Sequence, residues 1–139
     1  MKIEIRKTGA SPYSMEATNE SGQTVQLDGS PDIGGVDAGM RPMELLATSL
    51  GGCSAIDVIN ILRKKREEPS DILISIEAKR QQGVVPATFE AIHVHFTFFG
   101  NVSEEAAEKA LQLSFEKYCS VTKILEPTCA VTHSFSIEH

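Results

Sequence analysis

RPMELLATSLGGCSAIDVINILRKKRE, residues 41–67, is the longest stretch of the chain that is compatible with a helix. Pro42 suits a first helical turn, where its missing N–H group would have no partner. The basic run at residues 63–66 suits the last turn, because cations are favourable at the C-terminal end of the helix dipole. No charged residue lies between Glu44 and Asp57, and a helix that is apolar nearly all round is usually buried. We therefore expect a long, buried central helix.

Two adjacent glycines, Gly51 and Gly52, lie in the middle of this helix, immediately before Cys53. Each glycine costs about 1 kcal/mol relative to alanine in a helix interior, so another interaction has to offset that cost. We expect a close approach of another backbone to the helix near Cys53. The segment alone leaves open whether Cys53 is a functional thiol or a small buried residue beside a helix contact.

The composition is that of an ordinary globular domain. Its 139 residues fit one domain, residues 1–139, with 41% hydrophobic and 23% charged residues. The net charge of −6 argues against nucleic acid as a partner, because phosphate binding needs a basic surface. We see no signal peptide and no apolar run of about 18 residues, so we expect no membrane insertion. Three cysteines without a secretory signal favour a reducing, cytoplasmic location.

The residues before the central helix have the pattern of strands and turns. Short alternating segments near residues 3–5, 13–18 and 23–27 predict an antiparallel meander. Residues 28–39 contain one proline and four glycines, and we expect a mobile loop there that covers a site.

The residues after the central helix predict a second sheet and two helices. Three segments alternate apolar and polar residues in the manner of strands: residues 71–79, 89–99 and 130–138. The first two should form a hairpin. Ser103 is the expected N-cap of a helix that reaches residue 118, and Ser120 that of a short helix ending near Glu126. This element order indicates an α+β protein.

Cys53 and Cys119 are the candidates for redox chemistry. A two-cysteine peroxidase needs one thiolate to attack the peroxide bond and a second thiol to condense with the resulting sulfenic acid. Spacing alone does not show that the two residues meet, so a redox pair and two unrelated buried thiols both remain open.

The central stretch resembles the signature helix of the OsmC/Ohr family, the osmotically induced and organic-hydroperoxide-resistance proteins. EKYCSV, residues 116–121, and VTHSFSIE, residues 131–138, resemble further parts of the same family. The resemblance covers essentially the whole chain and is greater to the OsmC-like branch than to Ohr proper. It implies an OsmC-like fold, in which antiparallel sheets surround a long central buried helix in an intertwined homodimer with active sites at the subunit interface.

The resemblance also implies a chemistry. Cys53 matches the peroxidatic cysteine of the family and Cys119 its resolving cysteine. The implied activity is thiol-dependent reduction of hydroperoxides, preferentially organic ones, in oxidative stress defence. It uses an external dithiol reductant and no metal or bound cofactor.

The activating groups of the family are not all matched. The glutamate that helps to activate the reactive cysteine in the family corresponds to Met43 here. The adjacent Glu44 lies roughly opposite Cys53 on a straight helix, because successive residues are rotated by about 100°. The arginine that stabilises the thiolate is not identified. The candidates are Arg6, Arg41 and Arg80. For Arg41 a solvent-facing position before the helix is the simpler interpretation.

Other polar residues have simpler structural interpretations. We expect Asp57 to form hydrogen bonds within the dimer core. His93 and His95 share a strand face and are an exposed pair rather than a metal site. His133 is a core or cross-strand histidine, and Cys129 a structural thiol.

Two functions from different classes follow. The first is a two-cysteine hydroperoxide reductase, which the cysteine pair favours. The second is a non-enzymatic module that binds a small molecule or senses redox state, which the methionine at position 43 favours.

Overall fold

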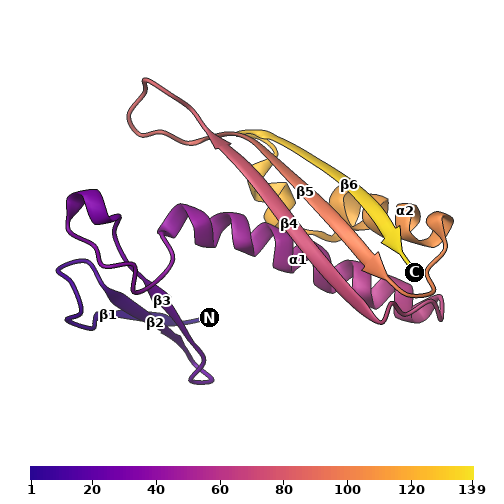
Figure 1. Ribbon diagram of the computed structural model, residues 1–139, viewed down its shortest axis with the longest axis horizontal. Helices are drawn as coiled ribbons and strands as arrows, with labels where there is room; N and C mark the ends of the chain where they lie inside the picture. The colour runs from indigo at the N-terminus through magenta and orange to yellow at the C-terminus, as the bar shows by residue number, and fades with distance from the viewer. The chain divides into compact units, whose positions relative to one another are not determined.

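The computed structural model describes all residues from 1 to 139. The chain divides into two compact units, Met1–Leu46 and Ala47–His139. Its two sheets and one long helix confirm the expected α+β class (Figure 1). The elements in chain order are β1 (Ile3–Lys7), β2 (Met15–Asn19), β3 (Thr24–Leu27), the 3₁₀ turn η1 (Pro31–Ile33), α1 (Pro42–Lys64), β4 (Asp71–Arg80), β5 (Phe89–Phe99), α2 (Glu104–Leu113), the π-helical turn η2 (Ser114–Tyr118), α3 (Ser120–Leu125) and β6 (Ala130–Glu138).

The N-terminal unit contains the expected antiparallel meander, in the order β1–β2–β3. Ile5, Ala17 and Val25 are paired across the three strands and share one face of this sheet. Ile5 is 59% exposed and Val25 45% exposed in the protomer. The meander therefore has an apolar face that its own chain does not bury.

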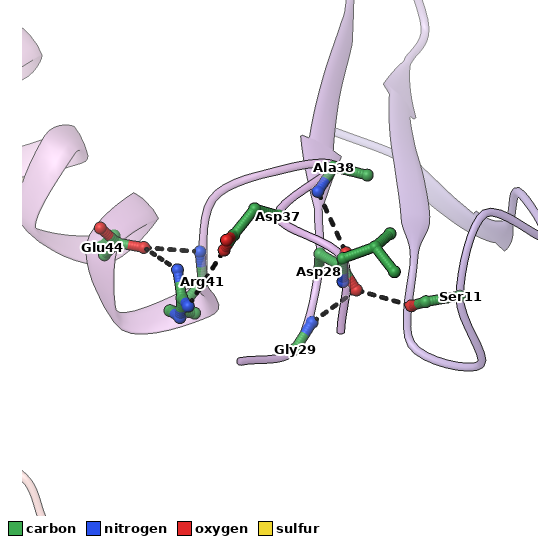
Figure 2. Close-up of polar contacts among 8 residues, drawn as sticks. Ser11, Asp28, Gly29, Asp37, Ala38, Arg41 and Glu44 are labelled. Carbon is green, nitrogen blue, oxygen red and sulfur yellow. Dashed lines mark hydrogen bonds and ion pairs between the residues drawn. The ribbon is translucent and has the colours of Figure 1, made fainter. Parts of the chain in front are cut away.

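The segment between β3 and α1, which we expected to be a mobile loop, is tied to one buried carboxylate (Figure 2). Asp28 Oδ1 accepts hydrogen bonds from Ser11 Oγ and the Gly29 N–H, both at 2.8 Å. Its Oδ2 accepts from the N–H groups of Val36 at 2.9 Å and Ala38 at 3.1 Å. These bonds, above all that from Val36, hold the pKa of Asp28 well below its usual range despite burial. The segment is therefore a loop that hydrogen bonds to Asp28 hold in place.

Helix α1 is confirmed, but it is not buried all round. In the C-terminal unit one face is buried, and its members are Ala47, Leu50, Gly51, Ser54, Ala55, Val58 and Leu62. On the other side Ile56 is 71% exposed and Ile59 39% exposed. The expectation of complete burial is wrong for the protomer, because the sheet covers only one side of the helix.

Helix α1 also corrects the expectation that no segment is apolar enough for a membrane. By length and composition alone it is able to cross one. The core helix of a soluble protein passes the same test, and the buried face of α1 fits that explanation.

The C-terminal unit contains the second sheet, in the order β4–β5–β6. The expected hairpin is confirmed, since β4 and β5 are antiparallel. Strand β6 is parallel to β5, so the expectation of antiparallel sheets is wrong for this pair. The reason is the connection through α2, η2 and α3, because a helical crossover brings the chain back to run in the same direction. Helices α1 and α2 lie behind the sheet in Figure 1.

The core of this unit lies between the sheet and the helices. The strictly alternating side chains of β5 point into it and are fully buried: Ile92, Val94, Phe96 and Phe98. On α1, a Cβ atom added to Gly51 would lie 2.5 Å from Ile76 Cδ1, whereas one added to Gly52 would meet nothing within 4 Å. The expected close approach is therefore confirmed only at Gly51, and a side chain of β4 makes it, not a backbone.

Candidate functional site

Cys53, Asp57 and Cys119 lie together in the C-terminal unit. The Sγ atoms of the two cysteines and one carboxylate oxygen of Asp57 all lie within 4.8 Å of one another. Cys53 is half-buried, whereas Cys119 is 1% exposed. The structure therefore brings together the two thiols that the sequence singled out and adds a carboxylate.

Helix α1 supplies two members of this cluster. Cys53 and Asp57 are four residues apart in the helix, and residues at this spacing lie on the same face one turn apart. Asp57 was expected to form hydrogen bonds in a dimer core. Within the protomer, its Oδ2 accepts a hydrogen bond of 3.0 Å from Ser114 Oγ.

The third member, Cys119, is positioned by the π-helical turn η2. Its backbone N–H donates to Ser114 O at 2.8 Å, a hydrogen bond that spans five residues and widens the helix by one. Such π-bulges are frequent at functional sites. The residue then begins α3, where Sγ accepts from the Thr122 N–H at 3.4 Å. Cys119, not the expected Ser120, is thus the N-cap of α3.

Ser114 is the site residue that the sequence analysis missed. It lies on the apolar stripe of α2 and η2, and it is completely buried. Its hydroxyl lies 3.0 Å from Asp57 Oδ2 and 3.3 Å from Ser54 O. A serine on an otherwise apolar stripe was the available signal, because a buried hydroxyl needs a polar partner.

Burial dominates the electrostatic setting of Cys119. Burial raises the pKa of the Cys119 thiol, and the neighbouring Cys53 thiol adds to this, whereas hydrogen bonding from Thr122 opposes it. Cys119 is therefore protonated at neutral pH. A thiol in this state has to lose its proton before it reacts as a nucleophile.

Three of the charged residues considered as activating groups have other partners in the structure: Arg41, Glu44 and Arg80. Arg41 Nη2 lies 3.3 Å from Asp37 Oδ1, and Nη1 lies 3.6 Å from Glu44 Oε1 (Figure 2). Glu44 also accepts the Arg41 backbone N–H at 2.9 Å, so it caps the start of α1. Arg80 Nε donates to Ala87 O at 2.9 Å in the hairpin.

His93 and His95 are half-buried and take part in a line of hydrogen bonds with β6, so the expectation of an exposed pair is wrong. His93 lies 2.7 Å from Thr132 Oγ1 through Nδ1 and 2.7 Å from Ser134 Oγ through Nε2. His95 lies 2.7 Å from Ser134 Oγ through Nδ1 and 3.1 Å from Ser136 Oγ through Nε2. Both rings are oriented by hydroxyl groups.

The remaining candidates, His133 and Cys129, make packing and hydrogen-bond contacts within the C-terminal unit. His133 stacks on Phe115, with ring centroids 4.6 Å apart, and is paired across the strands with Val94. Cys129 is buried, and its Sγ donates to Leu125 O at 3.5 Å. This contact agrees with the expected structural thiol.

Comparison with known proteins identifies the family. Residues 34–134 match the family described as OsmC-like protein. Protein YhfA of Escherichia coli K12 is 36% identical over 118 residues, which are 84% of each chain. A hypothetical protein from Aquifex aeolicus is 33% identical, with a TM-score of 0.80 over 99% of this chain and 97% of that one.

More distant structures share the fold. The organic hydroperoxide resistance protein OsmC from Legionella pneumophila is 14% identical, with a TM-score of 0.70 over 98% of this chain and 97% of that one. At this identity the likeness concerns the fold alone. The family match and the identity to YhfA go further, and this chain belongs to the OsmC-like protein family.

Proposed function

We propose that this protein is a two-cysteine reductase of hydroperoxides, preferentially organic ones. The observation that carries the proposal is the approach of the Cys53 and Cys119 sulfur atoms to within 4.8 Å. The name of the Legionella pneumophila relative, an organic hydroperoxide resistance protein with the same fold, supports the same class of substrate.

The reaction uses the two thiols in sequence. Cys53 is the more exposed thiol, so as a thiolate it attacks the peroxide oxygen, breaks the O–O bond and becomes a sulfenic acid while the alcohol leaves. Cys119 then attacks this sulfur, releases water and forms the disulfide. An external dithiol, available in the cytoplasm, reduces the disulfide and restores both thiols.

The assembly that belongs to this proposal is a homodimer. Ile5 and Val25 on the meander and Ile56 on α1 are exposed in the protomer, and exposed apolar patches mark interaction surfaces. A second copy of the chain that covers them should bury more than about 2,000 Å², where obligate interfaces begin. Sedimentation at micromolar concentration should give a dimer, and a monomer would contradict this part.

The chemical test is a single addition of one equivalent of cumene hydroperoxide to the reduced protein. Two thiols should disappear per peroxide, and peptide mass mapping should find an intrachain Cys53–Cys119 bridge. Cys119→Ser should react once and then accumulate sulfinic acid at Cys53 under excess peroxide. Cys129→Ser is the matched control and should behave as the wild type. Peroxide consumption by Cys53→Ser at the wild-type rate would rule out the proposal.

A redox-sensing module is the second candidate, and the raised pKa of Cys119 favours it. A protonated resolving thiol closes the disulfide slowly, because only the thiolate attacks. Repeated turnover with an excess of dithiol and peroxide separates the two functions. A reductase continues to consume peroxide, whereas a sensor forms its disulfide once and then turns over very slowly.

A further inference from the structure

The donor atoms of Cys53, Asp57 and Cys119 form a cluster with the composition of a soft-metal site. Thiolate sulfur and carboxylate oxygen are both ligands of zinc, and three protein ligands with an open fourth position are common in zinc sites. We propose that the reduced cluster binds a thiophilic divalent cation, for which Zn²⁺ is the test ion. The family resemblance implies no metal, so this inference rests on the geometry of the chain itself.

The spacing of the atoms suits a metal. Zn–S bonds of about 2.3 Å in tetrahedral geometry place two sulfur atoms about 3.8 Å apart. The Cys53 and Cys119 sulfur atoms lie within 4.8 Å, so they need to approach by no more than about 1 Å. A disulfide bond of about 2.05 Å requires a larger movement. The reduced cluster is therefore closer to a metal-binding geometry than to a disulfide.

The carboxylate is already oriented. Ser114 Oγ holds Asp57 Oδ2 at 3.0 Å, which leaves the second carboxylate oxygen for a metal. Ligating carboxylates are usually hydrogen-bonded in this way, and loss of such a partner typically weakens metal binding 10–100-fold. Ser114 would therefore be a positioning residue for the third ligand.

Binding requires both thiols in the reduced state. Each cysteine gives its proton to the solvent, the metal keeps its oxidation state, and water completes the fourth position. A Cys53–Cys119 disulfide removes two ligands, so metal binding and oxidation exclude each other. A bound metal should therefore also slow the reaction with peroxide; this consequence and the loss of binding on disulfide formation rest on the proposed function.

The test measures binding without peroxide, so its failure is distinct from failure of the reductase. Reduced, metal-free full-length protein is titrated with Zn²⁺ against a chromogenic chelator, and one ion per chain is expected. Co²⁺ in place of Zn²⁺ should give a thiolate-to-metal charge-transfer band. The band should be lost when the wild-type protein is oxidised to the disulfide, a control that changes no residue.

Variants assign the ligands. Ser114→Ala should weaken Zn²⁺ binding by about 10–100-fold. Cys53→Ser, Cys119→Ser and Asp57→Asn should each weaken it more than Ser114→Ala does, because each removes a ligand. Cys129→Ser is the matched control and should bind as the wild type does. Wild-type protein without a charge-transfer band, or unchanged zinc affinity in either Cys53→Ser or Cys119→Ser, would overturn the proposal.

Discussion

The contact between Gly51 and Ile76 allows a quantitative test of how α1 packs on β4. An alanine at position 51 would place its Cβ atom 2.5 Å from Ile76 Cδ1, with Ile76 Cγ1 at 3.4 Å as the next atom of that side chain. Ile76→Val deletes Cδ1 and leaves the rest of the side chain. We therefore predict that the two substitutions are strongly coupled.

The expected magnitudes follow from opposing terms. Gly51→Ala gains about 1 kcal/mol in helix propensity and loses about 1–3 kcal/mol through overpacking. Ile76→Val alone costs about 0.5–1.5 kcal/mol. In the double variant the overpacking is relieved, so its stability should be close to that of the wild type. The free energy of unfolding of the double variant should be higher, by about 1–3 kcal/mol, than the sum of the two single effects predicts.

The assay is urea unfolding of the four proteins, followed by circular dichroism at one fixed protein concentration, because dimerisation would make stability depend on concentration. Gly52→Ala, alone and with Ile76→Val, is the matched control and should show additive effects. Additive effects for Gly51→Ala and Ile76→Val, within about 0.5 kcal/mol, would refute the packing described for α1.

Three further outcomes are expected. Gly52→Ala should raise the free energy of unfolding by about 1 kcal/mol, since no atom of the protomer obstructs it; a lower Tm would contradict this. Closure of the Cys53–Cys119 disulfide after a peroxide pulse should accelerate about tenfold per pH unit from pH 7 to 9, because the raised pKa of Cys119 keeps its thiolate scarce; a flat stopped-flow profile would exclude this cause. Asp28→Asn should lower the Tm at pH 7. Because the pKa of Asp28 is depressed in the folded protein, its carboxylate stabilises the fold at pH values above its unfolded pKa of about 4. This stabilisation is lost progressively as the pH falls below that value. The Tm difference between the two proteins should therefore shrink at pH 3, and an unchanged difference would contradict the role of Asp28.

The elements that the sequence predicted well are those whose pattern is local. The alternation in β5 identifies the four side chains that are completely buried, from Ile92 to Phe98. The apolar stretch with Pro42 at its start gives α1. Alternation carries no information on strand direction, however, and the parallel pairing of β6 with β5 depends on where the helical crossover leaves the chain.

The site was predictable only in part. Cys53 and Cys119 were identified as candidates from the sequence. Their approach, however, depends on the widened turn η2, whose sequence contains no glycine or proline that would predict it. The contact between Ser114 and Asp57 joins residues 57 positions apart, and local patterns do not encode such pairs. The exposure of one side of α1 in the protomer was not predicted. Apolar residues indicate that a surface is covered, but they do not identify the partner that covers it.

The line of imidazoles and hydroxyls across β5 and β6 has a consequence for the order of its protons. The members, in sequence along the line, are Thr132, His93, Ser134, His95, Ser136 and Thr97. Ser134 has one hydroxyl proton and two acceptor lone pairs, so it donates to at most one of the two rings that it joins. At least one of the two ring nitrogens that face it, His93 Nε2 or His95 Nδ1, therefore carries a proton when both hydrogen bonds are made. The tautomers of the two histidines are thus coupled through Ser134, because a neutral His93 protonated only on Nδ1 together with a neutral His95 protonated only on Nε2 would leave one of these two contacts without a proton.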